Sequence, residues 1–213
     1  MTSSKTPFRL TPTRLTTART STVLLACLAA VALNLVFGIG IGYLALPFLF
    51  LDTIGTFVAS ALFGTWWGIA VGVITNLVLG WTIEPAAFWF IPVQVLVAVI
   101  VGLSSRRDGY TVKTAPIAAA LCAVLVPLLS TAIAVMAFGG SHGGVMDGMV
   151  AGLQRAGQSL FSAAFWPRVG LEFIDKAVTA LIALGLVTLV ARWFTKQGGE
   201  VAVDEPEAVQ QTH

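Results

Sequence analysis

The chain has 213 residues, of which 57% are hydrophobic and only 10% are charged, and its mean hydropathy is +0.90. Soluble domains carry about 25% charged residues, so this composition indicates an integral membrane protein. The length accommodates about six spans of roughly 20 residues with short loops, which excludes a separate soluble catalytic or nucleotide-binding domain within this chain. We therefore expect any energy for transport to come from a partner or a gradient.

The N-terminal segment, residues 1–20, is polar and carries four basic residues but no acidic one: Lys5, Arg9, Arg14 and Arg19. An apolar run without charge follows from Ser21 to Leu46. We expect this run to be span one and not a cleaved signal, because most of it follows Cys27, the residue at which a lipoprotein signal would be cut.

Five further apolar runs complete the predicted membrane domain, at residues 48–63, 66–81, 88–103, 115–138 and 170–191. The loop after span four and the chain after span six add five basic residues to the N-terminal four: Arg106, Arg107, Lys113, Arg192 and Lys196. Because nine of the twelve Lys and Arg residues then share one face, the positive-inside rule predicts that both termini are cytoplasmic.

The predicted fold is an all-α integral membrane protein, a six-transmembrane-helix bundle with both ends inside the cell. The basic segment 1–20 lies in the cytoplasm, residues 21–196 form the membrane domain, and residues 197–213 form a polar, disordered tail. Residues 145–165 between spans five and six form an amphipathic helix on the outer side. Two interpretations of this helix remain open, a surface connector and a lid over an externally facing pocket.

Three spans carry small or polar residues at every fourth position: Ala26, Ala30, Asn34, Gly38 and Gly42; Asp52, Thr56, Ser60 and Gly64; Gly68, Gly72, Asn76 and Gly80. Small residues at this spacing allow helix backbones to approach closely in lipid, so we interpret the stripes as packing seams. Ala26 and Ala30, near the cytoplasmic end of span one, are alternatively candidates for contact with another protein.

Polar residues gather at the outer ends of four predicted spans, where ionisable groups are costly and indicate a functional site. The candidate substrate-binding residues are Asp52, Asn76, Glu84, Trp89, Gln94, Glu172, Asp175 and Lys176. Such a pocket is net acidic and lies near aromatic side chains, so a small, polar, cationic heterocycle would suit it.

Structural interpretations of the same residues stay open. Glu172 and Lys176 have the i, i+4 spacing of a helical ion pair and need no ligand if they pair with each other. Asp52 is also placed to cap the outer end of span two, where a carboxylate accepts backbone N–H bonds. Glu84, which precedes a proline, suits a solvated loop.

The sequence contains no motif for catalysis, since it has no metal-ligand spacing, no nucleophile motif and no phosphate-binding glycine loop. We therefore expect no enzyme activity, no bound metal, no cofactor and no nucleic-acid partner for this chain.

Four strings give the chain, over about residues 20 to 196, a resemblance to the substrate-binding S components of energy-coupling factor (ECF) vitamin transporters. These strings are Leu51-Asp52-Thr53-Ile54-Gly55-Thr56, Phe63-Gly64-Thr65-Trp66-Trp67-Gly68, Thr75-Asn76 and Glu172-Phe173-Ile174-Asp175-Lys176-Ala177. The resemblance implies a six-span protein that captures a vitamin or related micronutrient from outside.

The resemblance also implies partners: a transmembrane coupling (T) subunit and two cytoplasmic ATPase subunits, which supply the energy for inward release. An Ala-x-x-x-Ala pattern on span one contacts the coupling subunit in that family, and Ala26 and Ala30 match it here. Two other classes remain open, the membrane sensor of a signalling system and a stand-alone secondary transporter. Two matched halves with broken helices, which the latter class often contains, are not evident in the sequence.

Overall fold

A computed structural model describes residues 20–44, 49–140 and 145–196, and every regular element in this part is helical. The elements are α1 (Thr20–Tyr43), α2 (Ile54–Phe63), α3 (Thr65–Thr82), the 3-10 helix η1 (Pro85–Phe90), α4 (Ile91–Ser104), α5 (Thr114–Phe138), α6 (Val145–Arg155) and α7 (Leu160–Lys196). Two predicted segments lie outside the described residues: the basic segment 1–20, except for its last residue, and the tail 197–213.

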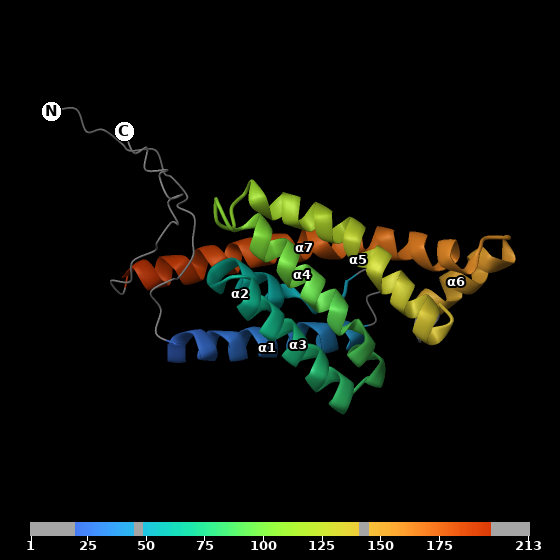
Figure 1. Ribbon diagram of the computed structural model, residues 1–213, viewed down its shortest axis with the longest axis horizontal. Helices are drawn as coiled ribbons and strands as arrows, with labels where there is room; N and C mark the ends of the chain where they lie inside the picture. Colours follow the sequence, from blue (N-terminus) through green and yellow to red (C-terminus); the bar gives the residue numbers. More distant parts are fainter. Residues whose placement is uncertain (1–19, 45–48, 141–144, 197–213) are drawn as a thin grey trace, which may run out of the picture.

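Four stretches of the described chain are long and apolar enough to cross a membrane: Thr20–Tyr43, Pro85–Ser104, Thr114–Phe138 and Leu160–Trp193. They indicate a multi-pass membrane protein. Helix α2 is apolar but has only 10 residues, and α3 is not among the four, so the six spans stay a prediction. The beginning of α1 and the end of α7 lie at the same end of the bundle (Figure 1).

Three predicted helices have boundaries in the structure that differ by more than five residues from the prediction. Span two was predicted over residues 48–63, but α2 begins only at Ile54 and is preceded by non-helical backbone in which Leu51 has a φ of +50°. The amphipathic helix ends at Arg155 and not at residue 165, because Gly157 with a φ of +91° turns the chain. Helix α7 accordingly begins at Leu160, ahead of the predicted start at residue 170.

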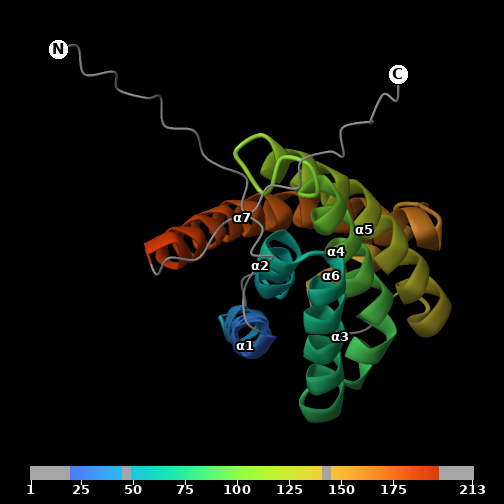
Figure 2. The ribbon, with the colours of Figure 1, turned by 60° about the vertical axis from the view of Figure 1, so that its left-hand side comes forward.

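Helix α2 is short but central, and eight of its ten residues are buried. Figure 2 shows it between α1 and α7, with α3 and α4 on a further side. Gly64, with a φ of +97°, connects α2 to α3 in a single residue, a conformation that favours glycine. Four helices, α1, α3, α4 and α7, therefore pack around this short helix.

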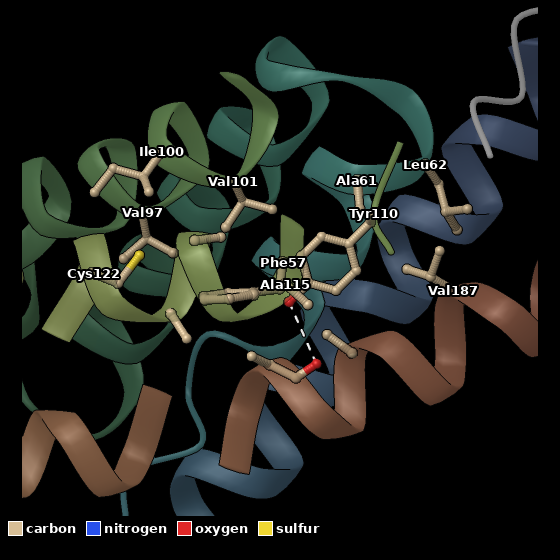
Figure 3. Close-up of a cluster of buried hydrophobic side chains, with 14 of the residues drawn as sticks. Phe57, Ala61, Leu62, Val97, Ile100, Val101, Tyr110, Ala115, Cys122 and Val187 are labelled. Atoms are coloured by element: carbon tan, nitrogen blue, oxygen red, sulfur yellow. Dashed lines mark hydrogen bonds between the residues drawn. The ribbon is translucent and has the colours of Figure 1, made fainter. Parts of the chain in front are cut away.

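The main hydrophobic core joins α2, α4, α5 and α7, and its central side chains are drawn in Figure 3. Phe57 of α2 meets Tyr110, from the loop between α4 and α5, edge to face at 6.4 Å. Burial raises the pKa of the Tyr110 phenol, so its hydroxyl stays protonated and donates to the Ala180 carbonyl of α7 at 3.4 Å. This loop residue thereby ties α2 to α7.

Small residues allow close packing between helices at positions where an added Cβ atom would overlap a neighbouring helix. A Cβ on Gly55 would overlap the Ala30 carbonyl oxygen, and one on Gly68 would overlap the Ser60 hydroxyl. Ala30 is consequently buried between α1 and α2, and Ala26 is half-buried. Ala30 therefore packs against the α2 backbone, and its contact and that of Ala26 with another protein stay predictions.

Replacing Gly55 by alanine is expected to lower the free energy of unfolding by about 1–3 kcal/mol, since the added methyl group meets backbone atoms that cannot rotate away. The thermal melting midpoint of the detergent-purified protein measures this change. Gly185→Ala in α7 is the matched control, because nothing lies within 4 Å of its Cβ position. Equal melting midpoints for the two variants would contradict the close contact between α1 and α2.

Candidate functional site

The polar groups of the bundle meet near the middle of the helices. The Gly55 backbone N–H, in the first turn of α2, donates to the Asn34 side-chain oxygen of α1 at 2.6 Å. Helix α1 continues for nine residues beyond Asn34 to Tyr43, which is about 14 Å at 1.5 Å per residue. Asp52, just before the first residue of α2, lies against Gly38, which is five residues or about 8 Å before the end of α1. The placement of this end of α2 toward the outside of the membrane stays a prediction.

Asn34 is the centre of a hydrogen-bond network that links three helices. Its side-chain amide donates to the hydroxyls of Thr56 on α2 and Thr75 on α3, each at 3.1 Å. Its oxygen accepts the Gly55 N–H, so both donors and the acceptor of the amide are used. Asn34 is fully buried, and an amide with these satisfied bonds fixes the three helices relative to one another.

Gln94 of α4 belongs to the same network. Its side-chain oxygen accepts a hydrogen bond from the Thr56 hydroxyl at 2.9 Å, and its nitrogen donates to the Asp52 backbone carbonyl at 3.3 Å. Gln94 is 2% exposed. These bonds give Gln94 a structural task, which is to hold the backbone of Asp52 in place.

A second cluster lies on α7 and centres on Lys176. Its ammonium group lies 2.6 Å from an Asp175 oxygen, 3.1 Å from a Glu172 oxygen and 3.3 Å from the Thr53 hydroxyl. The contacts with Asp175 and Thr53 are hydrogen bonds, and the contact with Glu172 is an ion pair. The ion pair predicted between Glu172 and Lys176 is confirmed, and Asp175 completes it.

Asp175 anchors the segment that leads into α2. Its second carboxylate oxygen accepts hydrogen bonds from the backbone N–H groups of Phe50 and Leu51, both at 2.8 Å. Asp175 is fully buried, and these bonds compensate for the loss of water around its carboxylate. They also explain why residues 49–53 are not helical, because two of their backbone donors are taken by a side chain of α7.

Asp52 differs from the other carboxylates of the site. It is half-buried, and the only hydrogen-bond donor to its carboxylate among the described residues is its own backbone N–H. The charges of Lys176 and Asp175 lie close enough to interact with it. Gly38 of α1 faces it, and a Cβ there would lie 3.2 Å from the Asp52 Cβ.

Two charged side chains continue the cluster toward α6. Arg168 of α7 is 6% exposed, donates to the Ala164 carbonyl at 2.8 Å, and interacts electrostatically with Asp147 of α6 and with Glu172. Asp147 therefore lies close to the α7 cluster. Both interpretations of α6, as a surface connector and as a lid, stay predictions.

Three predicted site residues have other surroundings. Asn76 donates to the Ala87 carbonyl at 3.0 Å and so holds η1 against α3. Glu84 is exposed between these elements, and Trp89 is 59% exposed with its edge against Phe138 at 6.2 Å. The structure brings together Asp52, Gln94, Glu172, Asp175 and Lys176. Within the described chain, none of these five forms a hydrogen bond or ion pair with Asn76, Glu84 or Trp89.

The sequence did not mark Asn34, Thr53 or Thr75 as members of the site. Each is an amide or hydroxyl side chain within an apolar run. Such a side chain needs a hydrogen-bond partner inside the membrane, and this pattern could have identified the three residues. Among the described residues, no group of three His, Cys, Asp or Glu side chains is arranged to hold a metal ion.

Comparisons with protein-family models, with curated proteins and with solved structures find no match to this chain.

Proposed function

We propose that this chain is the substrate-binding S component of an ECF-type transporter. In this role it captures a small, vitamin-like micronutrient from outside the cell and releases it inward, driven by a transmembrane coupling subunit and two ATPase subunits. The single observation that carries the proposal is the half-buried Asp52 carboxylate in the middle of an apolar helical bundle. Ionisable groups at this depth are costly and indicate a path or site for a ligand.

The construction around Asp52 supports a binding role. Residues 49–53, which contain Asp52 and lead into α2, are not helical. Non-helical backbone is tolerated at membrane depth where protein encloses it or where it lines a cavity. Gln94 and Asp175 hold this segment from two sides. A carboxylate on a fixed backbone is pre-organised for a ligand, which lowers the entropic cost of binding.

The proposed location is the cell membrane, with both termini in the cytoplasm. The predicted cytoplasmic face carries Arg106, Arg107, Lys113 and Arg192. The beginning of α1 and the end of α7 at one end of the bundle agree with this orientation (Figure 1).

Affinity purification of the tagged full-length chain from its native membrane is expected to recover a transmembrane coupling subunit and two ATPase subunits. An unrelated multi-pass protein from the same membrane, carrying the same tag, is the control. Recovery of a kinase or cyclase instead would overturn the transporter assignment in favour of a sensor. Gradient-driven uptake by the chain alone in proteoliposomes would overturn it in favour of a secondary transporter.

A further inference from the structure

Among the described residues, each charged group inside the bundle has a charged partner or a set of hydrogen-bond donors, with the exception of Asp52. Asp175 accepts two backbone N–H bonds and contacts Lys176. Glu172 pairs with Lys176 at 3.1 Å, and Asp147 interacts with Arg168. Each of these carboxylates has a cation or a set of fixed donors that compensates its removal from water.

Among the described residues, Lys176 forms no ion pair with Asp52. Its ammonium donates hydrogen bonds to Asp175 and Thr53 and forms an ion pair with Glu172 at 3.1 Å. Among the described residues, no other side chain forms an ion pair or hydrogen bond with the Asp52 carboxylate. One negative charge is therefore left without a direct partner in the middle of the bundle.

The position of this charge is fixed even though the charge has no partner. The Asp52 carbonyl accepts from Gln94, and the two residues before Asp52 are held by the Asp175 carboxylate. Asp52 therefore cannot move to another cation without breaking these bonds. A carboxylate fixed at this depth is stabilised by a cation that comes to it.

A second polar group, the Thr179 hydroxyl of α7, is also without a hydrogen-bond partner among the described residues. Thr179 lies one helical turn after Asp175, on the face that carries Asp175 and Lys176, and it is fully buried. Its hydroxyl has no hydrogen-bond partner within the described chain. A buried hydroxyl without a partner is a group that a polar ligand can satisfy.

We propose that the ligand is an organic monocation, such as a protonated amine, and that its positive charge pairs with Asp52. This inference rests on the proposed function, because it names the class of substrate for the same site. Asp52 is the residue that contacts the charge, whereas Gln94 and Asp175 are positioning residues. Glu172 and Asp175 share the Lys176 ammonium, so neither is the residue that contacts the charge of the ligand.

The test compares full-length wild type, Asp52→Asn, Asp52→Glu and Asp108→Asn, purified in detergent from native membrane. Asp108→Asn removes the same charge from an exposed aspartate of the loop after α4 and is the matched control. Mass spectrometry of released small molecules is expected to find one organic cation in wild type and in Asp108→Asn. Asp52→Asn is expected to reduce it at least about tenfold, and Asp52→Glu to retain part of it.

Benzylammonium and benzyl alcohol, a charged and a neutral probe of similar shape, provide an independent measurement. Benzylammonium is expected to raise the melting midpoint of wild type but not of Asp52→Asn, and benzyl alcohol is expected to raise neither. A neutral or anionic molecule released from wild type, or full retention of the cation by Asp52→Asn, would overturn the inference. So would the absence of both a released cation and a benzylammonium shift in wild type.

These results are separate from the test of the transporter assignment. If the cation binds through Asp52 but no ATPase subunits co-purify, the charge assignment stands and the proposed function fails. If the ATPase subunits co-purify but the bound molecule is neutral, the proposed function stands and only the charge assignment fails.

Discussion

Lys176→Met is expected to destabilise the protein by about 3–5 kcal/mol, the cost of removing one partner from a buried ion pair. The substitution keeps a long apolar side chain but leaves Asp175 and Glu172 without their shared ammonium. The Thr53 hydroxyl also loses its donor. The thermal melting midpoint and the denaturant midpoint of the detergent-purified protein measure the loss.

The control for this prediction is Lys113→Met, which removes the same charge from an exposed loop residue and is expected to leave stability nearly unchanged. Adding Glu172→Gln and Asp175→Asn to Lys176→Met is expected to restore part of the stability, because no uncompensated carboxylate then remains in the cluster. A Lys176→Met variant as stable as Lys113→Met would show that the cluster is open to water.

Much of the helix pattern could be predicted from the sequence because lipid selects long apolar runs. The run predicted at residues 115–138 corresponds to α5 at Thr114–Phe138, and the run at 66–81 to α3 at Thr65–Thr82. The start of α2 could not be predicted, since Phe50 and Leu51 are as apolar as the helix that follows. Their backbone is diverted by Asp175, more than 120 residues later in the chain.

The candidate site was predictable by residue type but not by depth or by role. An apolar chain makes its few charged residues conspicuous, so Asp52, Glu172, Asp175 and Lys176 were singled out, and the structure places them together. Their depth follows from where α2 begins, which the sequence misplaced. The sequence could not show that Gln94 and Asp175 position the backbone while Asp52 has no direct partner. These roles depend on contacts between different helices, which residue spacing along one helix does not predict.

Asn34→Leu is expected to cost about 3 kcal/mol or more, because one substitution of similar size removes three hydrogen bonds at the centre of the bundle. The buried Gly55 N–H loses its acceptor, at about 1–3 kcal/mol, and two bonds to threonine hydroxyls are lost at about 1 kcal/mol each. Since α1 packs only against α2 and α3 among the described helices, the substitution loosens α1 as a unit.

Asn76→Leu is the matched control for this second prediction, because it replaces a buried asparagine of the same bundle that makes one hydrogen bond in place of three. Its melting midpoint is expected to lie between those of wild type and Asn34→Leu. Asn34→Asp keeps the acceptor for Gly55 but buries a carboxyl group without a cation, so it is expected to be at least as destabilising as Asn34→Leu. If Asn34→Leu is no less stable than Asn76→Leu, the network does not hold α1 in place, and the middle of the bundle is held by close backbone contacts such as that of Gly55 with Ala30.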